Sequence, residues 1–114
     1  MTVKELITVL GLDPLTEGTN SEEQIETGYV SDLLSDVIAN APENSVWVTV
    51  QRHINILGVA KLKNIIAIVT PRSLSVEAAV IDKAKAEGIA LLRSDLSAFE
   101  LTGKLYTLLL KEGQ

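Results

Sequence analysis

The sequence contains no cysteine, and this absence excludes several kinds of site at once. Without a thiol there is no disulfide, no thiolate metal ligand, no iron–sulfur cluster held in the usual way by cysteines, and no cysteine nucleophile. Such a chain fits a reducing cytoplasm. The 114 residues must therefore be held together by a hydrophobic core, which the 46% hydrophobic content can supply.

Histidine is almost as scarce, because His53 is the only one. A site with several histidines from one chain is excluded, whereas a metal shared across a symmetric dimer is not. We expect no metal and no cofactor. A hydrolytic triad can be drawn from Ser31, His53 and Asp32, with Ser35 and Asp36 as alternatives, but the nucleophile-elbow pattern Gly-x-Ser-x-Gly is missing. The sequence therefore favours a protein that is not an enzyme.

Charge and hydropathy exclude further classes. The net charge is −5 and the basic residues form no run, which argues against nucleic acid or an anionic membrane as the partner. No apolar run approaches the ~20 residues of a membrane helix, and the first residues lack the pattern of a signal peptide. Neither Gly-x-x-x-x-Gly-Lys-Ser/Thr nor Gly-x-Gly-x-x-Gly occurs. We expect a soluble, cytoplasmic protein.

The stretch from Ser45 to Asn55 organises the chain. Its β-branched and aromatic run at 46–50 is typical of a strand that is covered on both faces. Further strands are predicted within 24–30, at 64–70 and at 89–92, with apolar helical patterns between them. Connections of this length predict parallel strands joined by helices, so the expected fold is a three-layer α/β domain over residues 1–114 with helices on both faces.

Capping residues predict where the helices begin and end. The capping boxes are Thr2 with Glu5 and Ser97 with Glu100, the single caps are Ser31 and Ser75, and the glycine stops are Gly11 and Gly88. The helix that Ser75 caps is predicted to run to Glu87. Residues 13–23 have the composition of a loop, with a brief strand near Leu15.

The three arginines of the chain share one position in this pattern. Arg52, Arg72 and Arg93 each follow a predicted core strand. Parallel strands end at the same sheet edge, where ligands bind in such folds and helix N-termini favour anions. A phosphate or carboxylate site is one hypothesis; the alternative is that these arginines simply pair with acidic neighbours. The candidate ligand residues are Ser31, Asp32, Gln51, Arg52, His53, Asn55, Arg72 and Arg93.

Three blocks, at 28–36, 47–55 and 91–106, resemble the small stand-alone DRTGG-domain proteins. These are similar to the amino-terminal domain of HPr kinase/phosphorylase, and related domains accompany CBS domains. The resemblance implies one DRTGG-like domain that dimerises and acts as a regulatory or ligand-sensing module. The literal string Asp-Arg-Thr-Gly-Gly is absent, and so is the phosphate-loop domain in which the chemistry of the kinase resides.

Two further hypotheses stay open beside a regulatory module that binds a small anionic or nucleotide-like ligand. Stand-alone members of the family also resemble accessory proteins found near iron-only hydrogenase genes. The resemblance therefore allows a protein-interaction subunit of a hydrogenase or redox system that binds no small molecule. The third hypothesis is a small enzyme that uses His53 as a general acid or base.

Overall fold

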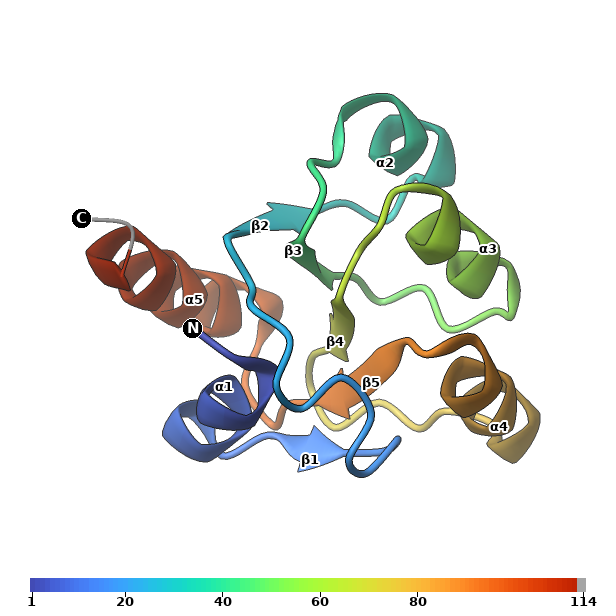
Figure 1. Cartoon of the computed structure of the whole chain (residues 1–114), viewed down its shortest axis with the longest axis horizontal. Coiled ribbons are helices and arrows are strands. Elements are labelled where there is room, and N and C mark those ends of the chain that lie inside the picture. Colours follow the sequence, from blue (N-terminus) through green and yellow to red (C-terminus); the bar gives the residue numbers. More distant parts are fainter. Residues whose placement is uncertain (113–114) are drawn as a thin grey trace.

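The structure is a computed structural model that describes residues 1–112, so the last two residues of the predicted domain lie outside the description. Helices and strands alternate along most of the chain (Figure 1). In chain order the elements are α1 (Val3–Leu10), β1 (Asp13–Pro14), β2 (Thr27–Val30), α2 (Leu34–Asn40), β3 (Ser45–Val48), α3 (Asn55–Leu62), β4 (Ala67–Thr70), α4 (Ala78–Glu87), β5 (Ala90–Arg93) and α5 (Ala98–Glu112).

The strands form one five-stranded sheet in the order β1-β5-β4-β3-β2. Strands β2 to β5 are parallel and lie side by side in chain order, and only the two-residue β1 is antiparallel, to β5. The predicted α/β class with a mostly parallel sheet is confirmed. Because β2 to β5 are parallel, all four strands end at the same edge of the sheet. A helix follows each of them.

Helices cover both faces of the sheet, as predicted. On one face, Val46 and Val48 pack with α1 and α5. On the other, Trp47 packs with α2, α3 and α4. Every residue of β3 and β4 is buried, which explains why their sequences are continuously apolar instead of alternating. Figure 1 shows the sheet between these two layers of helices.

The predicted caps are confirmed at both ends of α1. The Thr2 hydroxyl accepts from the Glu5 backbone N–H, and the Glu5 carboxylate accepts from the Thr2 backbone N–H. That backbone hydrogen bond, with a second from the Thr2 side chain, lowers the pKa of Glu5. Gly11 then ends the helix in the left-handed region, with φ 62°. Gly88 ends α4 in the same way, with φ 71°.

Two predicted caps are wrong. Helix α2 begins at Leu34, after Leu33, because Ser31 still follows the sheet: its carbonyl oxygen accepts from Trp47 Nε1 at 2.8 Å. Helix α4 begins at Ala78 instead of directly after Ser75. There, the Ser75 carbonyl oxygen accepts from an Arg52 guanidinium nitrogen at 2.7 Å, so a tertiary contact fixes the residue in the loop. Neither helix has a side-chain cap.

The Trp47 hydrogen bond gives a test of this packing. We expect Trp47→Phe to lower the free energy of unfolding by about 2 kcal/mol, because it leaves a small cavity and a carbonyl without its donor. Urea denaturation followed by circular dichroism measures the change. A loss under about 0.5 kcal/mol would show that the packing and the hydrogen bond of Trp47 contribute little to stability.

Candidate functional site

The candidate site is the edge at which the four parallel strands end. Extension of the strand register brings Thr49 beside Thr70, and Thr70 pairs directly with Arg93. Six of the eight predicted ligand residues lie in the loops that leave these strands, while Asn55 is the first residue of α3 and Arg93 the last residue of β5. The structure thus brings them to one edge of the sheet, although several are held by partners within the chain.

Asp32 joins the first two loops of this edge. One of its carboxylate oxygens, Oδ1, accepts from the Thr49 hydroxyl at 2.8 Å and from the Val50 backbone N–H at 2.9 Å. In return, the Gln51 side-chain amide donates to the Asp32 backbone carbonyl at 2.9 Å. Asp32 and Gln51 therefore fix the loops after β2 and β3 relative to each other.

Arg52 joins the second loop to the third. Its guanidinium donates to the Val50 carbonyl at 3.3 Å as well as to the Ser75 carbonyl. His53 is exposed, and its Nδ1 accepts from the Asn55 backbone N–H at 3.2 Å at the start of α3. No serine hydroxyl hydrogen-bonds His53 among the described residues, so the triad drawn from the sequence is not formed there.

The loop after β4 has an unusual backbone. Arg72 and Ser73 both adopt positive φ, at 55° and 53°, in a turn closed by the Leu74 N–H on the Pro71 carbonyl at 3.3 Å. Two consecutive residues other than glycine in this region store strain. Their N–H groups donate to Leu96 and Ser94 carbonyls, both at 2.8 Å, so the loop after β5 holds the turn.

The three arginines differ in how they are held. Arg93 forms an ion pair with Asp13 at 2.6 Å, across the antiparallel β1–β5 pairing. Arg52 bonds two carbonyls, as described above. Arg72 is exposed, and its guanidinium has no hydrogen bond or ion pair within residues 1–112. Of the three, Arg72 is therefore the one whose guanidinium has no partner among residues 1–112.

Thr70 is the last residue of β4, at the carboxyl edge of the sheet. The chain leaves β4 toward α4 on one face and leaves β5 toward α5 on the other, and such divergence opens the crevice where α/β folds bind ligands. Thr70 is 0% exposed, and its hydroxyl has no hydrogen-bond partner within the described chain. An unpaired buried hydroxyl lowers the stability of the fold.

A second polar cluster lies beside this edge. The Tyr29 hydroxyl donates to Asp36 Oδ2 at 2.8 Å, and the Asn40 amide donates to Oδ1 at 2.9 Å. Hydrogen bonds from Ser31, Tyr29 and Asn40 lower the pKa of Asp36, while the hydrogen bond to Asp36 raises the pKa of the Tyr29 phenol. Tyr29 is thereby fixed over α2, next to the start of that helix.

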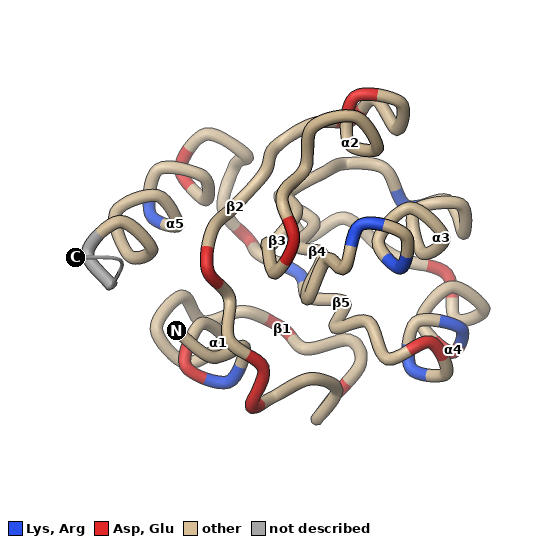
Figure 2. Tube along the Cα trace, turned by 45° about the horizontal axis from the view of Figure 1, so that its top comes forward, with Lys and Arg blue, Asp and Glu red and all other residues tan. Residues whose placement is uncertain are grey.

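Sequence reasoning missed two hydroxyls at this edge, those of Thr49 and Thr70. Their signal was a threonine within the last two positions of each of the two most apolar runs, where valine or isoleucine would fit the core equally well. Charges elsewhere are dispersed: Figure 2 shows basic residues spread over α1, α3, α4 and α5. No group of acidic and histidine side chains suited to a metal occurs in the described part of the chain. Nor is any helix of residues 1–112 long and apolar enough to cross a membrane.

The role of Asp32 can be tested by two substitutions. We expect Asp32→Ala to lower the free energy of unfolding by about 1–2 kcal/mol, because Val50 N–H and the Thr49 hydroxyl lose their acceptor. Asp32→Asn keeps an acceptor oxygen and should cost less than half as much. Chemical denaturation compares the two variants, and equal losses would show that the charge of Asp32 matters more than its hydrogen bonds.

The pKa of Asp36 offers a pH test. Because its folded-state pKa is lowered, the carboxylate stabilises the fold above the ordinary aspartate pKa, and this contribution is lost as the pH falls through the lowered value. Tyr29→Phe removes one donor, so the Asp36 pKa should rise toward its ordinary value. A carbon-detected NMR titration measures it, and an unchanged pKa would contradict the hydrogen bond.

Comparison with known proteins gives a likeness of fold. No protein-family model matches the sequence, and no curated protein matches it. Among solved structures, it is similar to the CBS and DRTGG domains of the regulatory region of Clostridium perfringens pyrophosphatase, solved with the activator diadenosine tetraphosphate. The TM-score is 0.68 at 11% identity, over 91% of this chain and 45% of that chain. The predicted DRTGG-like α/β fold is supported; this chain spans under half of that regulatory region.

Proposed function

We propose that this chain is a non-catalytic, ligand-sensing regulatory module that binds a small anionic or nucleotide-like ligand at the carboxyl edge of its sheet. The observation that carries the proposal is the free Arg72 guanidinium, displayed on a strained turn that neighbouring loops hold in place. The fold likeness to a regulatory region solved with a nucleotide activator supports the regulatory class over a catalytic one.

The contacts suggest separate roles within the site. Arg72 supplies the positive charge, and Arg52 organises the adjoining loops through the Val50 and Ser75 carbonyls. Helix α4 begins at this edge without a side-chain cap, so its first N–H groups suit a phosphate. The first N–H groups of α3 are already occupied, because Asn55 N–H donates to His53 Nδ1 and Ile56 N–H donates to the His53 carbonyl. His53 and Asn55 are exposed and can orient the ligand by hydrogen bonds.

The remaining predicted residues act as supports in this proposal. Asp32 and Gln51 hold the loop after β2 against the loop after β3, and Ser31 holds the start of the first loop against Trp47 of β3. Arg93 already shares its charge with Asp13, so it contributes less to an anion than Arg72 does. Homodimer formation and association with a hydrogenase system stay predictions from the resemblance, and no contact described above bears on the latter.

Isothermal titration calorimetry with diadenosine tetraphosphate, ATP and inorganic pyrophosphate tests the site. We expect Arg72→Asn to weaken binding about tenfold or more, the loss expected when a charged hydrogen bond is removed. Asparagine tolerates positive φ, so the stability of the fold should be unchanged. If pyrophosphate binds as tightly as the two nucleotides, the site recognises the phosphate groups and not the nucleoside.

The control variant is Lys83→Asn, which removes a cation from α4 toward its carboxyl end, remote from the strand ends. It lowers the net charge as much as Arg72→Asn does, so it should leave binding unchanged. Equal weakening in both variants, or no binding of any of the three anions, would contradict the proposal.

The substitution of Thr70 provides an independent test of the same site. We expect Thr70→Val to raise the free energy of unfolding by about 1 kcal/mol, because it replaces an unpaired buried hydroxyl with a methyl group of the same shape. If the hydroxyl contacts the ligand, the same variant binds more weakly. Thermal melts with and without ligand measure both effects, and a destabilised variant would show that the hydroxyl has a partner in the fold.

A further inference from the structure

We propose that the hollow between β2 and α5 is a second ligand site, which binds an uncharged and largely apolar small molecule. None of the eight predicted ligand residues lines this hollow. The inference therefore goes beyond the proposed function, and its test is separate from the test of the anion site at the carboxyl edge of the sheet.

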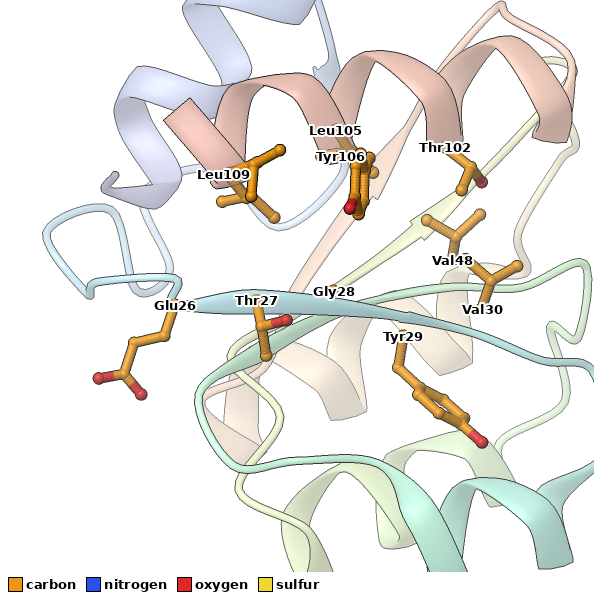
Figure 3. A pocket seen from close by; sticks show the side chains of 11 residues that line it. Glu26, Thr27, Gly28, Tyr29, Val30, Val48, Thr102, Leu105, Tyr106 and Leu109 are labelled. Atoms are coloured by element: carbon orange, nitrogen blue, oxygen red, sulfur yellow. The ribbon is translucent and has the colours of Figure 1, made fainter. Parts of the chain in front are cut away.

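The hollow has the size of a small-molecule site. Its volume is about 480 Å³, within the roughly 300–1,000 Å³ that is usual for ligand pockets. Figure 3 shows Leu105 and Leu109 of α5 on one side of it. Val30 and Val48 line it from the sheet. Strand and helix thus form two largely apolar walls around a space that a small molecule can fill.

The mouth of the hollow leaves apolar surface in contact with water. Val30 is 50% exposed, Leu110 48% and Tyr106 67%, and all three residues line the hollow. A bound apolar molecule would remove part of this surface from water, and removal of apolar surface from water is the main favourable term in such binding.

The lining of the hollow selects an uncharged ligand. Among the described residues, no lysine, arginine or histidine lines it, and Glu26 is the one carboxylate that does. The Glu26 side chain points away from α5 in Figure 3, and its Oε2 accepts from the Asn44 amide at 2.9 Å. An ionic ligand of either sign would lose its hydration here without gaining a counter-ion, which is unfavourable.

A second hollow of similar volume shows that size alone does not define such a site. The space of about 490 Å³ between α3 and α4 is lined by Lys61, Lys83 and Glu87, which form two ion pairs. An apolar molecule bound there would displace water from these charges. We therefore expect an uncharged ligand to prefer the hollow beside β2.

The backbone of β2 supplies polar groups to the hollow. Figure 3 shows the side chains of Thr27 and Tyr29 pointing away from α5, so these two residues reach the hollow through their backbone. Strand β2 pairs only with β3 in the described sheet, which leaves the peptide groups on its outer side without a strand partner. A ligand with one N–H, hydroxyl or carbonyl group can hydrogen-bond to such groups.

Gly28 keeps the hollow open. Its φ is not positive, and a Cβ added to it would meet Val46 at 3.6 Å and Leu109 at 3.8 Å, which is ordinary van der Waals contact. Neither the backbone nor the space inside the chain therefore requires glycine, although glycine weakens the interior of a strand. A glycine in a strand often marks the close approach of a ligand, and a larger side chain here would fill the hollow.

Fluorescence titration with N-phenyl-1-naphthylamine tests this site. The probe is uncharged, has aromatic rings and one N–H group, and becomes more fluorescent in apolar surroundings. We expect saturable binding of one probe per chain, with a dissociation constant of about 10 µM. Gly28→Val should weaken binding about tenfold or more, because its side chain takes up the volume of the ligand. Its melting temperature should stay the same or rise, because valine suits a strand better than glycine does.

A second variant changes the mouth of the hollow and not the strand. Leu110→Lys places a charge there and should weaken binding about tenfold. The fold should be unchanged, because Leu110 is exposed near the end of α5. The matched control is Leu62→Lys: Leu62 is also exposed, but it lines the hollow between α3 and α4. This control should bind the probe as tightly as the wild-type chain does.

Three results would overturn the proposal. The first is a wild-type chain that shows no saturable binding of the probe. The second is unchanged binding in both Gly28→Val and Leu110→Lys, because the probe would then bind elsewhere. The third is a wild-type chain that sediments as a dimer and does not bind the probe, because a second copy would then cover the hollow. Arg72→Asn should bind the probe normally, so a failure of the anion site is distinguishable from a failure of this one.

Discussion

The burial of β3 and β4 on both faces is the constraint on which the rest of the structure depends. All eight residues of these two strands are buried, and six of them are apolar; Ser45 and Thr70, at the outer ends, are the exceptions. Three helices cover one face and two cover the other, so the loops after the strands are where polar groups gather. The same architecture leaves β2 as an open edge. The proposed ligand site is thus a consequence of how this sheet is packed.

Within the carboxyl edge, the hydrogen bonds form a chain that links successive loops. Asp32 binds the loop after β3, Arg52 binds the loop after β4, and the turn at Arg72 is held by the loop after β5. A change at one loop would therefore be felt at the next, which is what a sensing module requires. Arg72 is the arginine that this arrangement leaves without a hydrogen bond or ion pair among residues 1–112, and it is the proposed contact for an anion.

Much of the fold could be predicted from the sequence because its signals are local. Continuous β-branched runs gave the core strands, and Thr2 with Glu5 gave the first helix start. Ser31 and Ser75 have equally good local signals but are overruled by distant partners, Trp47 and Arg52. The Arg93–Asp13 pair joins residues 80 positions apart, so no pattern predicts it. The hollow between β2 and α5 is lined by residues far apart in the sequence, so only the folded chain reveals it.

The most direct test of the central claim is a two-dimensional NMR titration of the amide groups with the dinucleotide named in the proposal. The account predicts that the largest shifts fall in the loops at 49–54 and 71–75 and are absent in Arg72→Asn. Shifts confined to β2 and α5, or no shifts at saturating concentration, would contradict a ligand site at the carboxyl edge of the sheet.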